Sequence, residues 1–182
     1  MTVGATDARV RHHLGARYAD TENRNIVDGT EDTRALSDRL SLAYQADIRI
    51  GRDLLSLALE RETTTFEQRG PVDFGDPNQE QEQDVSSIAA EYFGHVGDEV
   101  TWLASARFDD HEHFDDALTG RLSFAWRPTE ARTLRAAAGT GHKRPTFIEM
   151  FGYFPGQFHS NPQLQPEEST SFELGIEQHV SD

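Results

Sequence analysis

The sequence predicts an all-β protein, namely a segment of an antiparallel, up-and-down transmembrane β-barrel with about eight strands. Apolar residues recur at every second position in many separate stretches, a pattern that indicates strands with one apolar and one polar face. No uninterrupted apolar run is longer than three residues, whereas a membrane helix needs roughly 20. Short polar turns also alternate with long polar loops, which is typical of transmembrane barrels.

The expected strands follow from this alternation. In residues 40–48, for instance, Leu40, Leu42 and Tyr44 alternate with serine, alanine and glutamine. The alternation is equally clear in the last stretch, where phenylalanine, leucine and isoleucine are interleaved with glutamates and a glycine. In chain order, the expected strands are residues 10–18, 40–49, 55–65, 85–93, 100–108, 121–127, 134–140 and 171–177.

The connections divide into two kinds. Short turns are expected at residues 51–53, 97–98 and 128–130, and long polar loops at 22–37, 67–84, 109–116 and 142–169. Short turns would therefore lie at one end of the sheet and long loops at the other. A soluble β-sandwich has the same alternation of wet and dry faces, but more often places loops of mixed length at both ends.

Aromatic residues near the short turns favour the membrane interpretation. Trp102, Trp126, Tyr44 and Phe93 each lie within several residues of such a turn. If they collect at one level of the sheet, they form the aromatic girdle of a membrane interface. Core aromatics close to strand ends are the alternative.

Composition excludes some functions. The net charge of −15 and the single lysine, Lys143, argue against nucleic acid as a partner, because a phosphate backbone needs a basic face. There is no cysteine, so disulfides and thiolate metal sites are excluded. The acidic balance fits a well-solvated surface or a polar lumen.

The loop at residues 142–169 is conformationally restricted at several points. Pro145 can begin a helical turn over residues 146–151, and Gly152 can close it. Pro162 holds Asn161 extended, and Pro166 stiffens the chain before the last strand.

This region resembles TonB-dependent outer-membrane receptors. The shared pattern is a proline, a short Glu-x-Phe segment, Asn-Pro-x-Leu-x-Pro-Glu, a serine, an aromatic residue and Glu-x-Gly. The matching residues are Pro145, Glu149, Phe151, Asn161, Pro162, Leu164, Pro166, Glu167, Ser169, Phe172, Glu173 and Gly175. A second match begins at Arg107-Phe108-Asp109-Asp110 and continues through Phe114, Gly120, Ser123, Trp126 and Arg127. The resemblance covers roughly residue 40 to the end, and Arg144 departs from it where the family commonly has a small residue.

The resemblance implies energy-coupled uptake of a ferric siderophore or cobalamin across the outer membrane of a Gram-negative bacterium. The implied partners are that small ligand, membrane lipid and the TonB energy complex, which acts through a plug domain inside the barrel. No TonB box, plug domain, signal peptide or aromatic C-terminal strand is found. We therefore expect residues 1–182 to be a partial receptor barrel, taken from the middle of one with roughly 22 strands.

The resemblance also implies site residues. Pro145, Glu149, Asn161, Pro162, Leu164, Pro166, Glu167, Glu173 and Gly175 are expected to be structural, fixing how the long loop re-enters the barrel wall. The aromatic residues Phe151, Tyr153, Phe154 and Phe158 are candidates for ligand contact or for packing within the loop. We expect no catalytic residues, since a receptor does no chemistry on its ligand, and no cofactor.

Two alternatives are weighed against this interpretation. The acidic and histidine residues at 109–116 could hold a divalent cation, but their spacing fits no EF-hand or zinc motif, so a solvated loop and no metal are expected. A self-contained small β-barrel or sandwich that acts as a binding or structural module would have the same strand pattern.

Overall fold

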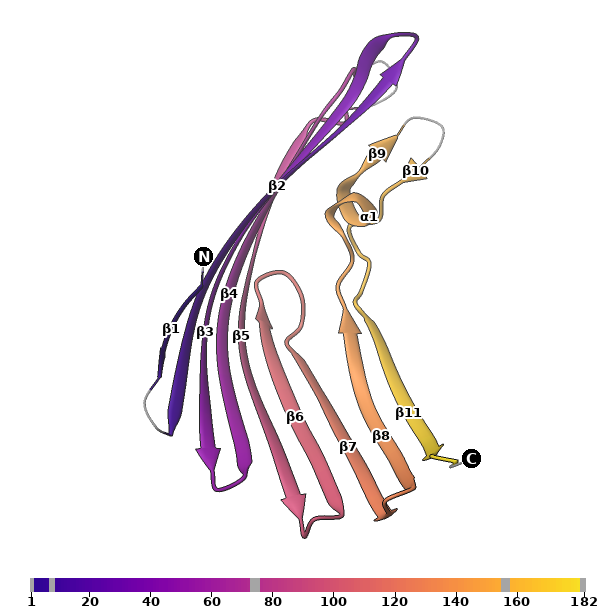
Figure 1. The fold of residues 1–182 in the computed structure, drawn as a ribbon. Helices are drawn as coiled ribbons and strands as arrows, with labels where there is room; N and C mark the ends of the chain where they lie inside the picture. The colour runs from indigo at the N-terminus through magenta and orange to yellow at the C-terminus, as the bar shows by residue number, and fades with distance from the viewer. Residues whose placement is uncertain (1, 7–8, 73–75, 155–157, 181–182) are drawn as a thin grey trace.

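A single antiparallel sheet dominates the computed structural model, which describes residues 2–6, 9–72, 76–154 and 158–180. Nine strands follow one another in the order β1 to β8 and then β11, with one short helix and a two-stranded hairpin between β8 and β11 (Figure 1). The elements are β1 (Thr2–Thr6), β2 (Val10–Val27), β3 (Thr30–Ile50), β4 (Asp53–Arg69), β5 (Gln79–Val96), β6 (Val100–His111), β7 (Ala117–Thr129), β8 (Arg132–Lys143), α1 (Phe147–Phe151), β9 (Tyr153–Phe154), β10 (Phe158–His159) and β11 (Glu167–Gln178).

The predicted fold class is confirmed. Each of the eight expected strands lies within one of β2 to β8 or β11, and every neighbouring pair is antiparallel. The strand β1, which pairs with β2, was not expected from the alternation. Among the described residues, no helix has the length and apolar character required to cross a membrane.

The register of the sheet separates an apolar from a polar face. Leu122 of β7 lies opposite Ala104 of β6 and Ala138 of β8, and Ala138 lies opposite Phe172 of β11. Because side chains alternate along a strand, these residues share one face. We call it the outer face; its large side chains include Leu14, Tyr18, Leu40, Leu42, Tyr44, Ile48, Leu55, Leu57, Leu59, Ile88, Tyr92, Trp102, Phe108, Leu118, Leu122, Phe124, Trp126, Leu134, Phe172, Leu174 and Ile176.

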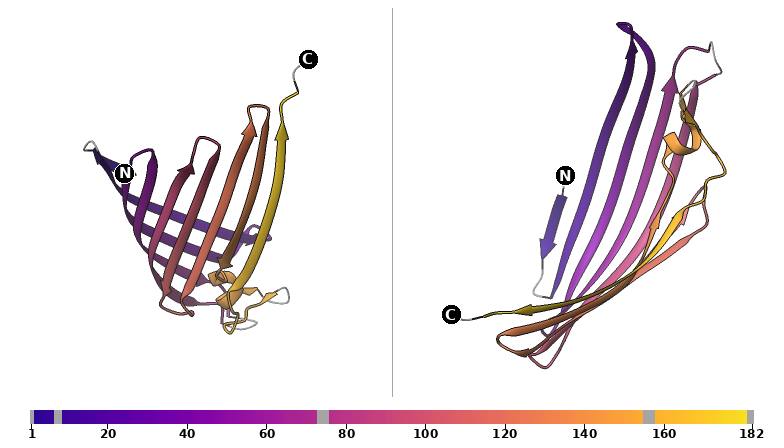
Figure 2. Two further views of the ribbon diagram at one scale, coloured as in Figure 1. Left: turned by 90° about the horizontal axis from the view of Figure 1, so that it is seen from below. Right: turned by 90° about the vertical axis from the view of Figure 1, so that its right-hand side faces the viewer.

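The outer face is uncovered over the part of the chain that is described. Leu174 is 90% exposed, and Leu42, Leu59 and Ile88 are each more than half exposed. The sheet is a single curved layer whose two edge strands, β1 and β11, do not pair with each other (Figure 2). The described residues form neither a sandwich nor a small closed barrel, so the two folds of the self-contained alternative are wrong.

The height of the apolar band matches a bilayer. On β6 the outer-face apolar residues run from Val100 to Phe108, and on β7 from Leu118 to Trp126. Nine residues of strand span about 30 Å. At a barrel tilt of about 40°, they rise about 23 Å, close to the roughly 25 Å apolar band of outer-membrane barrels.

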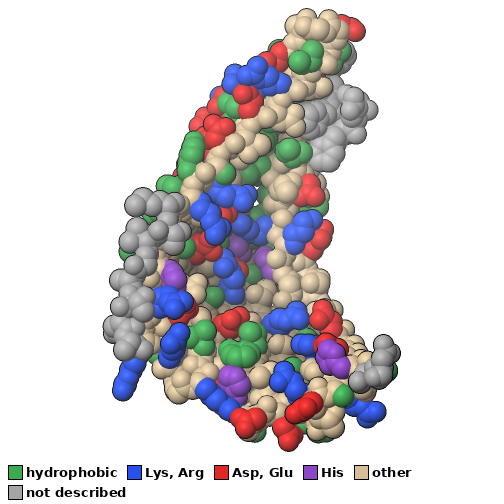
Figure 3. Space-filling model, viewed as in Figure 1, with side chains coloured by type: hydrophobic (Ala, Val, Ile, Leu, Met, Phe, Trp, Pro, Cys, Tyr) green, Lys and Arg blue, Asp and Glu red, His purple; other side chains and the backbone are tan. Residues whose placement is uncertain are grey.

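The polar face of the sheet is concave. Figure 3, which has the view of Figure 1, shows arginine, acidic and histidine side chains gathered over this hollow face. Helix α1 packs against it near the loop end, where Phe147 stacks on Phe66 of β4.

The predicted loop at residues 22–37 is wrong. Strands β2 and β3 continue through it and join in a two-residue turn at Asp28 and Gly29, whose φ values of 49° and 80° fit a tight hairpin turn. The hairpin extends past the apolar band, and its strands remain hydrogen-bonded there without apolar alternation. The Asp-Gly pair, which is typical of a two-residue hairpin turn, is the sequence signal that could have identified this turn. The next predicted loop, 67–84, is also longer than the observed connection, because β4 continues to Arg69 and β5 begins at Gln79.

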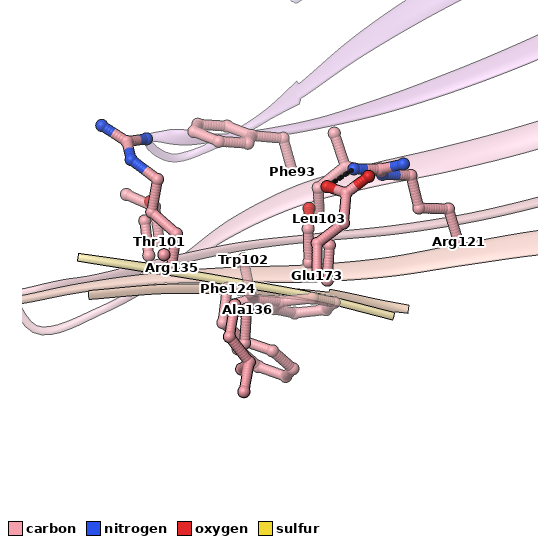
Figure 4. A pocket seen from close by; sticks show the side chains of 14 residues that line it. Phe93, Thr101, Trp102, Leu103, Arg121, Phe124, Arg135, Ala136 and Glu173 are labelled. Carbon is pink, nitrogen blue, oxygen red and sulfur yellow. Dashed lines mark hydrogen bonds and ion pairs between the residues drawn. The ribbon is translucent and has the colours of Figure 1, made fainter. Parts of the chain in front are cut away.

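Three of the four aromatic residues expected in a girdle lie on the outer face that a girdle requires, and Phe93 does not. Trp102, Trp126 and Tyr44 lie on the outer face, but Phe93 lies opposite Leu54 and Leu103 on the concave face. Figure 4 shows Phe93 and Trp102 pointing to opposite sides of the sheet. The adjacent Tyr92 faces outward instead and stacks on Trp102, with ring centroids 5.1 Å apart.

Candidate ligand-binding face

The concave face carries charges that are paired between strands. Arg107 of β6 donates to Asp109, Nε to Oδ1 at 2.8 Å, and to Glu60 of β4, Nη2 to Oε2 at 3.2 Å. Arg121 of β7 donates to Glu173 of β11 at 3.3 Å (Figure 4). Exposed pairs of this kind contribute only about 0–1 kcal/mol each. Their importance is that they make a hydrated, hydrogen-bonding surface on the side opposite the apolar band.

Helix α1 begins with a capping box. The Thr146 hydroxyl accepts from the Glu149 amide at 3.2 Å, and the Glu149 carboxylate accepts from the Thr146 amide at 2.7 Å. Because the Thr146 amide and hydroxyl bond to the charged form, the pKa of Glu149 lies below its ordinary value. Pro145 precedes the cap, and Gly152 closes the helix by donating to the Ile148 carbonyl at 2.8 Å. The structure thus places Glu149 and Pro145 at the helix start.

The Asn-Pro-x-Leu part of the motif forms a turn that is tied to the helix. The Asn161 amide donates to the Glu149 carbonyl at 3.0 Å, and its side-chain oxygen accepts from the Gln163 amide at 3.0 Å. The Leu164 amide closes the turn on the Asn161 carbonyl at 3.2 Å, with Pro162 inside it.

The remaining motif residues lie at or along β11. Pro166 directly precedes the strand, and Glu167 at its start lies 3.7 Å from Lys143 of β8. Glu173 faces Arg121 on the concave side, as described above. Gly175 lies beside Arg135 with space for a small side chain, since an added Cβ would be 3.9 Å from the Arg135 Cβ.

The aromatic residues of the loop contribute partly to its packing. Phe147 stacks on the buried Phe66 with centroids 5.6 Å apart and nearly parallel rings, and Phe151 lies against Phe147. The Gln79 side chain also donates to the Phe151 carbonyl. Ligand contact by Phe151 stays a prediction. The side chains of the other three candidates, Tyr153, Phe154 and Phe158, lie outside the described residues.

A cavity of about 530 Å³ lies between α1 and the loop end of the sheet. We call it the loop-side cavity; β2 to β5 line one side, and His142 with residues 144–148 line the other. Its charged lining residues are Arg39 of β3, Glu62 of β4 and Arg144. The Glu62 carboxylate lies 3.7 Å from Arg39 Nε and 3.6 Å from Arg144 Nη2.

Two histidines lie beside this cavity. His142, which lines it, stacks on His111 of β6 with ring centroids 5.7 Å apart. His111 is buried, and neither of its ring nitrogens has a hydrogen-bond partner within the described chain.

The acidic and histidine residues at 109–116 do not gather into a metal-binding arrangement. Strand alternation sends Asp109 and His111 to the concave face and Asp110 to the opposite one. Asp109 is engaged by Arg107 and Ser87. Over the described ranges, no three His, Cys, Asp or Glu residues are positioned to hold a metal ion.

Sequence reasoning did not identify Arg39, Glu62 or His111 as site residues. They are ordinary polar positions of alternating strands, and their neighbourhood depends on strand register and on how the loop folds back. The one available signal was Arg144, whose size departs from the family pattern at the point where the loop enters the cavity.

Comparison with known proteins gives one consistent result. A family model described as TonB dependent receptor-like, beta-barrel matches residues 3–182. The vitamin B12 transporter BtuB of Photobacterium profundum is 28% identical over 156 residues, which is 85% of this chain and 24% of that protein. BtuB of Vibrio vulnificus (strain YJ016) is 38% identical over 81 residues, covering 44% of this chain and 13% of that protein. The chain thus spans about a quarter or less of these relatives.

Solved structures share the fold. The siderophore receptor PirA from Pseudomonas aeruginosa superposes with a TM-score of 0.83 at 18% identity, over 99% of this chain and 34% of that one. A mutant of the ferric enterobactin receptor PfeA from the same organism gives a TM-score of 0.82 at 16% identity, over 98% of this chain and 31% of that one.

Proposed function

Because the chain belongs to the TonB-dependent receptor β-barrel family, we propose that it forms wall and external loops of an outer-membrane receptor for a ferric siderophore or cobalamin. The relatives named for vitamin B12 transport and the structural neighbours named as siderophore receptors support both ligand classes. The chain's own contribution is ligand capture on the concave face and beneath the loop of residues 144–166.

One observation supports this proposal most strongly. The outer face of the sheet carries an uncovered apolar band of bilayer height, and the opposite, concave face is hydrated and charged. A strand wall between lipid and water satisfies both faces together, and strands β3 to β8 each have a hydrogen-bonded neighbour on both sides. The band therefore contacts the lipid of a Gram-negative outer membrane. The concave face, rich in ion-paired arginines and carboxylates, lines the passage.

The proposed mechanism is binding and release without chemistry. The ligand is captured by loops and concave-face residues, a plug domain inside the complete barrel holds it, and the TonB complex supplies the energy for its release. The motif residues act by shape: the capping box and the Asn161 turn hold the loop in one conformation over the cavity. We propose no catalytic residue and no cofactor.

Growth and uptake measurements test the proposal. A strain that lacks its own receptors is complemented with the intact protein and supplied with one iron source or cobalamin at a time. TonB-dependent uptake of at least one ferric siderophore or of cyanocobalamin is expected. Uptake of none, with the protein folded in the outer membrane, would overturn the proposed function.

A further inference from the structure

We propose that Arg39 and Arg144, on either side of Glu62 in the loop-side cavity, bind an anionic oxygen group of the ligand, such as a carboxylate or a deprotonated catechol. This inference rests on the proposed function and narrows it to ligands that present such a group.

The charges of the cavity are unbalanced. Two guanidinium groups share the Glu62 carboxylate, which is the one acidic group within 4 Å of either guanidinium in the described chain. One positive charge is therefore left over. A negatively charged ligand group would neutralise it in a partly enclosed site, where screening by water is weaker than at an open surface.

The guanidinium donors are also not committed to Glu62. Both contacts, at 3.6 and 3.7 Å, exceed the 2.7–3.2 Å range of N–H···O hydrogen bonds. The second carboxylate oxygen of Glu62 is occupied by the Ser41 hydroxyl, which donates to it at 3.1 Å. The arginine donors are thus free to form shorter, charge-assisted bonds to a ligand oxygen.

The surroundings point the same way. His142 lines the cavity and stacks on the buried His111, which is not itself a lining residue. The imidazole of His142 adds a polar, hydrogen-bonding group to the wall that carries Arg144. Phe66 of β4 and Phe147 of α1 stack on each other and give the cavity an aromatic surface on both of its sides, which suits the apolar body that carries the anionic group.

Equilibrium binding to the intact protein in detergent tests the subsite. The probes are a trianionic ferric catecholate, an anionic ferric citrate complex and cyanocobalamin, which has no net charge. Arg39→Gln and Arg144→Gln should each weaken binding of an anionic ferric probe about tenfold, as expected for loss of a charge-assisted hydrogen bond. Glu62→Gln should strengthen it about fivefold or more, because the competing carboxylate is gone.

The matched control is Arg61→Gln. Arg61 precedes Glu62 on the same strand but faces the other side of the sheet, where it pairs with Asp84 and Ser86. Its substitution should change affinity less than twofold. The opposite effects of the arginine and Glu62 substitutions are a pattern that general misfolding does not produce.

The outcomes separate the two proposals. Unchanged affinity in the arginine variants, or weaker binding in Glu62→Gln, would overturn the subsite. Binding of cyanocobalamin alone would also overturn it while the receptor function stands. The expected variant pattern without TonB-dependent uptake would support the subsite and refute the transport function.

Discussion

Placing an arginine in the middle of the outer face should destabilise the protein far more than placing it one residue further along. Leu122 is the central residue of the β7 band from Leu118 to Trp126, and its neighbours across the strands are Ala104 and Ala138. These small side chains leave room for a long one. The main effect of Leu122→Arg is therefore to place a charge in the hydrocarbon, which costs about 2–4 kcal/mol at the bilayer midplane of a barrel.

Ser123→Arg is the matched variant. Ser123 pairs with Leu103 and Ala137 on the concave face, where an added arginine stays in water, and the expected change is within about 0.5 kcal/mol. The assay is urea unfolding of the intact protein in lipid vesicles, followed by tryptophan fluorescence. Leu122→Arg should lower the folding equilibrium constant about 30- to 1,000-fold. Equal effects of the two variants, or a larger effect of Ser123→Arg, would refute the assignment of the faces.

Three further predictions concern local structure. Gly94→Ala would place a Cβ 2.7 Å from the indole of Trp102, so the ring must move, and the emission of Trp102 should shift in a variant that retains this tryptophan alone. The lowered pKa of Glu149 means that its cap stabilises the loop above the ordinary carboxyl pKa, and that this stabilisation is lost as the pH falls through the lowered folded value. Protection of the α1 amides against hydrogen exchange should therefore decline in acid, and Glu149→Gln should abolish that dependence. Phe147→Ala removes the half-buried ring from Phe66, a loss of about 1–3 kcal/mol, and should speed cleavage of the loop after Glu149 by a glutamate-specific protease about tenfold or more.

Each of these has a control in the same region. Gly175→Ala meets no atom closer than 3.9 Å and should leave the emission unchanged. Glu168→Gln, on the exposed start of β11, should leave the acid response of α1 intact. Phe172→Ala removes an outer-face ring that is 80% exposed, so the cleavage rate in the loop should stay near that of the unsubstituted protein.

The strands were predictable because each has one apolar and one polar face, which gives the sequence a period of two. Where β2 and β3 extend past the apolar band, at residues 22–37, the period disappears although the hydrogen bonding continues. Only the turn-forming Asp28-Gly29 pair marked the hairpin. The side of the sheet on which Phe93 lies was also wrongly predicted. Closeness to a turn does not say whether a residue is at an outward-facing or an inward-facing position of the strand. Tyr92 faces outward and Phe93 inward.

The loop and its cavity were predictable to different extents. Pro145 and Gly152 act through local backbone geometry, so the short helix followed from the sequence, whereas the turn from Asn161 to Leu164 was not predicted. The cavity was not predictable either, because Arg39 and Arg144 are far apart in the chain and come together only through the registers of the strand pairs from β3 to β8 and the fold of the loop. The resemblance to a receptor family identified the loop motif, but it did not indicate which polar residues of the strands lie next to that loop.

The unequal strand lengths give the described rim two heights. Strand β3 continues for ten residues, Thr30–Arg39, beyond Leu40 of the apolar band, which corresponds to about 33 Å of chain, whereas β6 ends only three residues above Phe108, at His111. Along this part of the rim, the β2–β3 hairpin therefore extends much further beyond the apolar band than the connection between β6 and β7 does. A solute that approaches from the loop end would have less protein to pass on the β6–β7 side.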